Sequence, residues 1–225
     1  MDHLNLPSLR RILLHTRRRG GKPPVIIVPK NVTDLVRELG FSEVRSLDWW
    51  QSTNIAGIDI TATPAQHWGA RVLTDTHRGF GGYVLRNSSH SVYHAGDTGY
   101  FPGLTEIGQR LSPQIALLPI GAYRPAGVPS VHMTPEDAVR AFLDLRAQRL
   151  IPMHYGTFSL TDEPIDEPLQ RFTAAAKQAG IMSDVDTLHE GETRIYPSRC
   201  TEDVGKSPEA NPQGDIVPIT HSNPV

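Results

Sequence analysis

The sequence predicts a layered α/β protein. Short segments that are apolar or strictly alternating, as strands are, take turns with segments whose apolar residues recur at helical spacing. Segments 81–85 and 91–94 flank a polar turn and predict one antiparallel hairpin in this series. The 19 glycines and 19 prolines supply the many turns that short elements need. This order of strands and helices indicates a sheet covered by helices.

The N-terminal part of the chain predicts helices at 4–14 and 31–39 and strands at 24–29, 44–47 and 58–63. In the first helix, Leu6, Leu9 and Leu13 share one face, and the arginines and glycines that follow suit a helix C-terminus. The second helix has Asn31 or Thr33 as its N-cap and stops at a glycine. The first strand is too short for a helix and rich in branched side chains, so we expect it to be buried.

The C-terminal part predicts strands at 81–85, 91–94, 115–120, 150–153 and 193–196 and helices at 134–147 and 167–178. The first of these helices opens with a hydroxyl cap at Thr134, a proline and two acidic residues. The second helix is ended by Gly180. Beyond Pro197 the chain is polar and proline-rich without periodicity, so we expect a disordered tail over 200–225 after one domain over 1–199.

Composition limits the class of protein. A chain of 225 residues with 38% hydrophobic and 20% charged residues suits one large globular domain. A formal net charge of −2 provides no basic field, so no nucleic-acid partner is expected. The single cysteine, Cys200, excludes an internal disulfide framework. No apolar run reaches the length of about 18 residues that spans a membrane, and the first residues show no signal pattern, which predicts a cytoplasmic location.

Residues of metal-binding types stand at the ends of predicted strands and before the first helix. They are Asp2, His3, His67, Asp97 and His154. Strand ends on one edge of a sheet converge, and a rigid scaffold positions the loops there. Imidazole and carboxylate groups suit zinc or another first-row divalent ion. Such an ion lowers the pKa of its bound water to about 7, which supplies hydroxide at neutral pH.

Each of these residues also has an ordinary structural interpretation. A lone histidine after a strand is more often a hydrogen-bonded structural residue than a ligand. Asp97 lies between glycines and could simply hold its own turn. Asp2 and His3 could be idle residues at a chain start. The joint pattern of all five residues nevertheless favours a metal site.

Several sequence blocks carry a resemblance to a known family. They are Asp2-His3-Leu4, Thr63-Pro64-Ala65-Gln66-His67-Trp68, His94-Ala95-Gly96-Asp97-Thr98-Gly99-Tyr100 and Pro152-Met153-His154-Tyr155-Gly156-Thr157-Phe158. In this order they resemble the metallo-β-lactamase superfamily, and within it the branch related to N-acyl-phosphatidylethanolamine-hydrolysing phospholipase D. The block around Asp97 is highly specific for the superfamily, and the Trp49-Trp50 pair and the block 131–136 favour the branch. The resemblance covers residues 2–197.

The resemblance implies an αββα sandwich that binds two cations. One cation would take two leading histidines, His67 and the bridging Asp97, and the other would take Asp2, His3, Asp97 and His154. The family's first motif is His-x-His-x-Asp-His, and this sequence holds only its last two residues. We therefore expect an N-terminally truncated chain that lacks part of the first sheet. The expected cofactor is Zn²⁺, one or two per chain, with iron or manganese as alternatives.

Further residues are candidates for contact with the substrate. In the phospholipase-like branch, the histidine that matches His132 faces the active site, which implies a proton donor or oxyanion partner. A solvent-facing loop histidine is the alternative. Tyr123 is expected to line a substrate groove and Arg124 to hold a phosphate. The arginines at 10–11 and 17–19 predict either contact with an anionic lipid surface or a solvated helix end.

The predicted function is zinc-dependent hydrolysis of a phosphodiester in the manner of phospholipase D, through a metal-bound hydroxide. Asp97 and His132 are the catalytic candidates. The expected partner is a small-molecule or lipid phosphodiester, with peripheral contact to a membrane, and the oligomeric state is left open. Two alternatives stay open as well, because one fold hosts many chemistries. They are a lactonase or other ester hydrolase, and an inactive truncated remnant.

Overall fold

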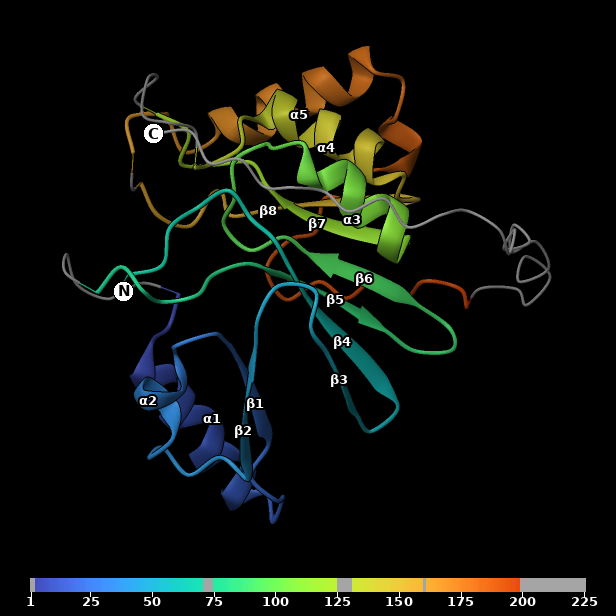
Figure 1. The fold of residues 1–225 in the computed structure, drawn as a ribbon. Helices are drawn as coiled ribbons and strands as arrows, with labels where there is room; N and C mark the ends of the chain where they lie inside the picture. Colours follow the sequence, from blue (N-terminus) through green and yellow to red (C-terminus); the bar gives the residue numbers. More distant parts are fainter. Residues whose placement is uncertain (1–2, 71–74, 125–130, 160, 199–225) are drawn as a thin grey trace, which may run out of the picture. The chain divides into compact units, whose positions relative to one another are not determined.

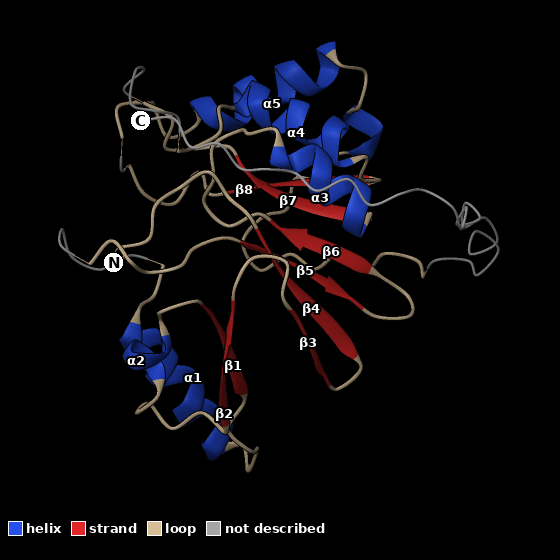
Figure 2. Ribbon diagram, in the orientation of Figure 1, coloured by secondary structure: helices blue, strands red, loops and turns tan. Residues whose placement is uncertain are grey.

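The computed structural model describes residues 3–70, 75–124, 131–159 and 161–198. The chain divides into two units, Met1–Ile195 and Tyr196–Val225, and every element named below belongs to the first unit. This unit contains both helices and strands, and the strands form two sheets (Figure 2). The α/β fold class predicted from the sequence is therefore confirmed.

The larger sheet is mixed and brings the ends of several strands to one edge. Its strands, in spatial order, are β3 (Ser52–Ile55), β4 (Ile58–Thr63), β5 (Gly82–Arg86), β6 (Ser91–His94), β7 (Ile115–Pro119) and β8 (Arg149–Met153). Strands β3 to β6 pair antiparallel, whereas β6, β7 and β8 pair parallel. Strands β4, β6, β7 and β8 consequently all run in the same direction. Their C-terminal ends lie at one edge of the sheet, where ligands bind in α/β folds.

Three helices cover one face of the parallel part of this sheet (Figure 1). They are α3 (Gly103–Leu111), α4 (Pro135–Leu145) and α5 (Glu167–Gln178). Strand β7 is apolar along its whole length and Leu118 is fully buried, as a strand covered by helices requires. Tyr93, Phe142 and Phe172 fill the interior from β6, α4 and α5. A core packed in this way gives the sheet edge a rigid support.

The ends of two helices agree with their sequence signals. Helix α4 begins with a capping box, in which the Thr134 hydroxyl accepts a hydrogen bond from the Asp137 amide at 3.1 Å. Helix α5 spans Glu167–Gln178 as predicted, and Gly180 follows it with a φ of +71°. Only glycine adopts that left-handed conformation at little cost, so it ends the helix.

Within the first unit, the N-terminal helices and strands form a small α/β substructure of their own. Helix α1 (Leu6–Arg18) precedes β1 (Val25–Pro29), and the short helix α2 (Thr33–Val36) leads to β2 (Glu43–Leu47), which pairs parallel with β1. Val28, Val32 and Val36 form its buried centre, against which Leu9 packs. Contrary to the prediction for the first strand, only Val28 of β1 is fully buried. The Arg45 guanidinium donates a hydrogen bond to the Asn54 carbonyl oxygen at 2.9 Å, which joins β2 to β3.

Strand β3 and helix α3 were not predicted from the sequence. Ala56 and Gly57 join β3 to β4, and both have a positive φ, +52° and +83°, as a two-residue hairpin of the type I′ requires. Helix α3 contains Gly108, whose added Cβ would lie 2.6 Å from the Leu145 carbonyl oxygen. Glycine weakens the local helix signal there, but it lets α3 approach the end of α4 closely.

One predicted helix is shorter than expected, and one predicted strand does not form. The helix expected at 31–39 is α-helical only over Thr33–Val36, and neither proposed cap acts, since Val32 occupies the N-cap position without a side-chain hydrogen bond. Asn31 has a φ of +60° and its side-chain amide donates instead to the His77 carbonyl oxygen at 2.9 Å. Residues 193–196 form no strand, and Ile195 is 88% exposed because no strand in the described part of the chain pairs with it.

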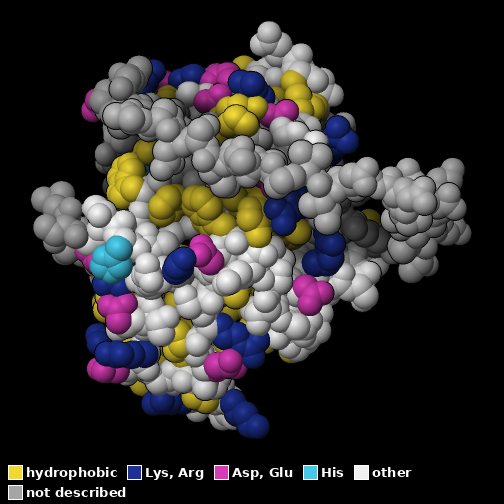
Figure 3. All heavy atoms as spheres, viewed as in Figure 1, with side chains coloured by type: hydrophobic (Ala, Val, Ile, Leu, Met, Phe, Trp, Pro, Cys, Tyr) yellow, Lys and Arg dark blue, Asp and Glu magenta, His cyan; other side chains and the backbone are white. Residues whose placement is uncertain are grey.

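No helix in the described ranges combines the length and the apolar character needed to cross a membrane. Figure 3 shows basic and acidic side chains interspersed on the face that it draws, together with a band of apolar side chains. That face therefore carries no large area of a single charge sign. The predicted contact of the N-terminal arginines with an anionic lipid surface stays a prediction. The predicted tail at 200–225 and Cys200 lie outside the described residues.

Candidate metal centre

Five histidine and aspartate side chains meet at the edge of the sheet where β4, β6 and β8 end. His67 follows β4, Asp97 follows β6 and His154 follows β8 directly. His132 precedes the N-terminus of α4, and His3 precedes α1. Because these strands run in the same direction, segments far apart in the sequence deliver their side chains to one place. Asp2, the fifth ligand predicted from the sequence, lies outside the described residues.

Asp97 stands at the centre of this group. Its Oδ2 lies 2.6 Å from His3 Nε2, and its Oδ1 lies 3.3 Å from His154 Nε2. The side chains of Asp97 and His154 are only 14% and 16% exposed, whereas His3 is 60% exposed. A largely buried carboxylate with an imidazole on each of its oxygens has the arrangement of a metal ligand.

The donors fall into two groups of three that share Asp97. One group is His3, Asp97 and His154, and the other is His67, Asp97 and His132; within each group the donor atoms lie within 4.8 Å of one another. The rings of His67 and His132 lie edge to face at 5.3 Å, and those of His132 and His154 stack at 5.5 Å. Two histidines and a carboxylate are a ligand set found for catalytic zinc and for non-haem iron.

Thr98 holds the Asp97 loop and the His67 loop together. Its buried hydroxyl accepts a hydrogen bond from the Gln66 amide at 2.9 Å and donates to the Gly99 carbonyl oxygen at 2.8 Å. The Gly99 amide in turn donates to the Gln66 carbonyl oxygen at 3.0 Å. Neither Gln66 nor Thr98 was singled out from the sequence. The only signal was their position next to a ligand, within the blocks that carry the family resemblance.

The turn that presents Asp97 needs a glycine. Gly96 has a φ of +65°, and a Cβ at this position would lie 2.9 Å from the Gly81 carbonyl oxygen. Its amide donates a hydrogen bond to His94 Nδ1 at 3.1 Å, so His94 supports the turn from β6. Burial lowers the pKa of His94, against the opposing effect of the Asp97 carboxylate, which favours a neutral ring that can accept this bond.

His154 has a left-handed backbone, with a φ of +60°. For a residue with a Cβ this conformation costs about 1–2 kcal/mol and persists where the surrounding structure imposes it. The Ile120 amide donates to the Met153 carbonyl oxygen at 3.0 Å, and Gly121 packs so closely that an added Cβ would lie 2.3 Å from the His154 carbonyl oxygen. The β7 end thus fixes the backbone that presents His154.

The orientation of His67 leaves one ring nitrogen available for a ligand. Its Nδ1 is 2.9 Å from the Trp68 carbonyl oxygen, and its ring stacks on the Trp68 indole at 4.5 Å. Its Nε2 is buried and makes no hydrogen bond to any residue that the structure describes. Leaving such a group buried and unsatisfied costs about 1–3 kcal/mol, which coordination of a cation would recover. The donors present here therefore fit a divalent metal ion.

His132 lies in the same cluster, and its environment favours the neutral ring. Burial lowers its pKa below the usual 6.5; the Asp97 carboxylate opposes this, and the neighbouring histidines His67, His154 and His3 lower it further. A neutral imidazole still carries one N–H donor and one acceptor nitrogen. It can donate a hydrogen bond to developing negative charge or ligate a metal, and its predicted catalytic role stays a prediction.

The two predicted substrate-binding residues lie on the loop after β7 and bind a carboxylate of the protein itself. The Tyr123 hydroxyl and the Arg124 guanidinium both donate to Glu167 Oε1, at 2.8 and 2.7 Å. Burial raises the pKa of Tyr123 to about 12, and the hydrogen bond to Glu167 adds to this. Neither Glu167 nor its neighbour Arg171 was picked out from the sequence, because both read as ordinary surface residues of a helix.

Comparison with known proteins places the chain in a family. A model of the beta-lactamase superfamily domain matches residues 1–155. The chain belongs to the metallo-β-lactamase superfamily. The two metal-type triads around Asp97 are thus found in a member of a superfamily of metal-dependent hydrolases.

Relatives within this superfamily agree with the predicted branch. The chain is 35% identical over 207 residues to an uncharacterized protein of Mycobacterium tuberculosis, covering 87% of this chain and 54% of that protein. It is 32% identical over 205 residues to the mitochondrial N-acyl-phosphatidylethanolamine-hydrolyzing phospholipase D of Saccharomyces cerevisiae, covering 87% and 42%. A metallo-hydrolase from Ignicoccus hospitalis has a similar structure, with a TM-score of 0.60, 28% identity and coverage of 80% and 71%. The chain spans about half the length of these two curated relatives.

Proposed function

We propose that this chain forms the catalytic centre of a metal-dependent hydrolase that cleaves a phosphodiester. One observation carries the proposal: two histidine–histidine–aspartate groups share Asp97 at the edge of the sheet. The name of the yeast relative, a phospholipase D, supports a phosphodiester as the substrate class. The partly enclosed Asp97 and His154 would bind one ion together with His3. His67 and His132 face the position of a second ion.

Zinc is the proposed ion, with iron and manganese as the other metals that these ligands accept. A divalent ion bound there polarises a phosphoryl or ester oxygen and lowers the pKa of its bound water to about 7. Asp97 belongs to both histidine groups, and its two oxygens contact His3 and His154 of the first group. His132 is proposed to donate a hydrogen bond toward the oxygen of the leaving group, where negative charge develops.

Exposed aromatic side chains beside the centre support a substrate with an apolar part. Trp68 follows His67 directly and is 56% exposed, and Phe158 lies four residues beyond His154 and is 75% exposed. Large apolar side chains at such positions are commonly covered by a ligand or a membrane. We therefore propose a lipid phosphodiester, reached at a membrane surface, as the substrate class, and an intracellular protein as its setting.

The proposal is tested by metal content and turnover of the purified chain. We expect zinc to bind and a phosphodiester, either bis(p-nitrophenyl) phosphate or N-acyl-phosphatidylethanolamine in vesicles, to be hydrolysed. Asp97→Asn should lose both the bound metal and at least about 99% of turnover, since it removes the shared charge. Asp59→Asn changes an exposed carboxylate on β4, which only accepts a hydrogen bond from Asn54, and should change neither.

The outcomes separate the competing functions. Hydrolysis of a lactone with no cleavage of either phosphodiester would overturn the phosphodiesterase proposal and leave an ester hydrolase. Zinc binding without any turnover on these substrates, or no zinc binding at all, would leave the alternative of a catalytically inactive chain.

A further inference from the structure

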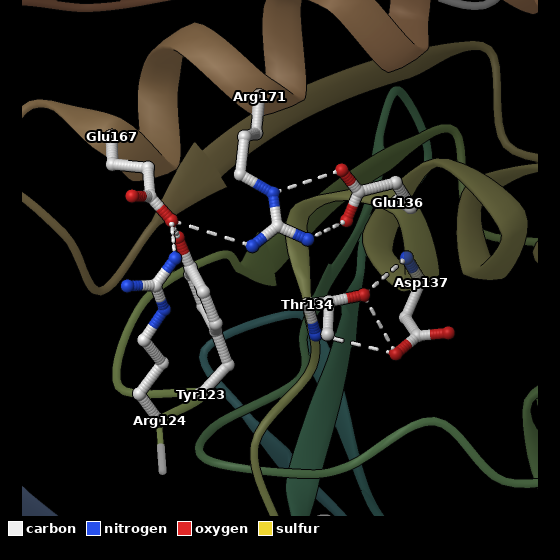
Figure 4. Close-up of polar contacts among 7 residues, drawn as sticks. All are labelled: Tyr123, Arg124, Thr134, Glu136, Asp137, Glu167 and Arg171. Carbon is white, nitrogen blue, oxygen red and sulfur yellow. Dashed lines mark hydrogen bonds and ion pairs between the residues drawn. The ribbon is translucent and has the colours of Figure 1, made fainter. Parts of the chain in front are cut away.

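Charged side chains of α5 contact the two segments that flank the metal centre. Figure 4 shows these side chains together with their partners from the loop after β7 and from the N-terminus of α4. We call Tyr123, Arg124, Glu136, Glu167 and Arg171 the Arg171 clamp.

Arg171 binds the N-terminus of α4 with two parallel hydrogen bonds. Its Nε donates to Glu136 Oε1 at 3.0 Å, and its Nη2 donates to Glu136 Oε2 at 2.7 Å. A fork of this kind fixes the relative orientation of two groups better than a single contact does. Glu136 lies in the first turn of α4, within the capping box that joins Thr134 to Asp137, and Met133, just before Thr134, is fully buried. His132 is the next residue back, so a fixed α4 N-terminus fixes the backbone of His132.

The same guanidinium also binds the loop after β7. Its plane lies over the Tyr123 ring at 4.7 Å, and its Nη1 donates to Glu167 Oε1 at 3.4 Å. That oxygen accepts the hydrogen bonds of Tyr123 and Arg124 as well, so one atom gathers three donors. Two residues before Tyr123, Gly121 packs against the His154 carbonyl oxygen. The clamp is therefore connected to the backbone of His154 through the loop that carries Gly121 and Tyr123.

A second carboxylate strengthens the hold on this loop. The Ala122 amide donates to Glu163 Oε1 at 2.6 Å, and Glu163 is only 7% exposed. Ala122 has a φ of +63°, so the loop turns sharply between Gly121 and Tyr123. The loop is thus held at two successive residues, Ala122 and Tyr123.

We propose that Arg171 is a positioning residue, which holds His132 and the loop against His154 in the relative placement that the metal centre requires. The inference rests on the proposed function for its effect on turnover. The ion pairs themselves are partly exposed, with side-chain exposures of 35% for Arg171 and 49% for Glu136, and such pairs contribute little to stability. Their effect is therefore on geometry, where a small displacement of a reacting group costs much rate.

Arg171→Gln tests the inference on the full zinc-loaded chain, with Arg110→Gln as the matched control. Arg110 likewise donates to a carboxylate, Glu106 at 2.9 Å, and covers an aromatic ring, Trp50 at 3.8 Å, but it lies on α3. The first readout is the ring ¹⁵N signals of His132, assigned by their loss in His132→Gln. We expect Arg171→Gln to shift these signals and Arg110→Gln to leave them in place, with zinc content unchanged in both.

Turnover is the second readout. We expect Arg171→Gln to lower kcat about tenfold on the phosphodiester with little change in KM, and Arg171→Lys to be nearly as slow, since an ammonium cannot make the two parallel bonds. Glu136→Gln in the Arg171→Gln background should add nothing further, because both remove the same link. If Arg171→Gln does not fold, Glu136→Gln alone serves as the test.

The two readouts test different claims. Unchanged His132 signals in Arg171→Gln, or equal shifts in the control, would overturn the positioning role. A wild-type chain without phosphodiesterase activity would overturn the proposed function. The ring signals of His132 would then still test the positioning role of Arg171.

Discussion

At the scale of single residues, the candidate centre depends on positions with unusual backbone or burial. Asp97 is presented by a glycine turn, His154 has a left-handed backbone, and His67 buries an unsatisfied ring nitrogen. The left-handed backbone of His154 and the unsatisfied ring nitrogen of His67 each cost free energy of folding. Their coincidence at one edge of one sheet indicates a site shaped by ligand binding.

The need for a glycine at position 96 can be measured by substitution. We expect Gly96→Ala to lower the free energy of unfolding by about 2–4 kcal/mol, because alanine pays for the left-handed backbone and its Cβ also meets the Gly81 carbonyl oxygen. Gly180→Ala is the control, since its φ is +71° but no atom lies within 4 Å of the added Cβ. Urea denaturation of both variants gives the comparison. Equal losses of unfolding free energy would mean that the contact of the added Cβ with the Gly81 carbonyl oxygen does not contribute to the destabilisation.

His132 separates a role in chemistry from a role in metal binding. We expect His132→Ala to lower turnover about a hundredfold, within the range for loss of a hydrogen-bonding or acid–base group, and to keep the bound zinc. Metal analysis by mass spectrometry and steady-state rates on the same preparation supply the measurement. Loss of one zinc per chain would show instead that His132 is a ligand of the group formed with His67 and Asp97.

At the scale of elements, the ion pair between α4 and α5 should make the stability of the fold depend on pH. Burial by itself would raise the pKa of Glu136, but its hydrogen bonds, led by the one from Arg171, outweigh this and lower it below 4.5. A carboxyl group with a lowered pKa adds stability that is complete above its unfolded pKa and is lost as the pH falls through its folded pKa. The stabilisation by this pair is therefore present at neutral pH.

The corresponding prediction compares wild type with Arg171→Gln in acid. The difference in free energy of unfolding should be present near pH 7 and should decrease as the pH falls through the lowered pKa of Glu136, since protonation removes the charge that Arg171 binds. Urea denaturation across that range measures it. A difference that stays constant throughout that range would mean that Arg171 stabilises the fold by packing on Tyr123 and not through Glu136.

At the scale of the whole molecule, the centre joins segments from both halves of the chain. His3 comes from the N-terminus, Asp97 from the middle and His154 from beyond α4. A metal ion that binds them binds the folded state alone, because the unfolded chain cannot hold these donors together. Metal binding and global stability should therefore be coupled.

We expect zinc to raise the midpoint of thermal unfolding of the wild-type chain, and a chelator to reverse the increase. The stabilisation amounts to about 2.7 kcal/mol when free zinc is 100 times the dissociation constant. Asp97→Asn should show no increase under the same conditions. An equal increase in that variant would place the zinc elsewhere on the molecule, for example on exposed histidines.

Much of the fold follows from local patterns in the sequence. The alternation of β4, the apolar run of β7 and the hydroxyl–proline–acid signal of α4 each depend on neighbouring residues, and each was predicted. Strand β3 and helix α3 depend on partners, a tight hairpin for one and a close approach to α4 for the other. Their local signals are weak for that reason, and the sequence did not predict them.

The sequence by itself determined which side chains were candidates for the centre, since histidine and aspartate at strand ends form a pattern along the chain. The family resemblance also implied a grouping, with Asp2, His3, Asp97 and His154 on one cation and His67 with Asp97 on the other. Only the tertiary structure decided the distances between these side chains. The common direction of β4, β6 and β8 brings His67, Asp97 and His154 to one edge, and packing then sets His132 beside His67 and ties Arg124 to Glu167. Such contacts join residues far apart in the chain, so their distances depend on the path of every element between them.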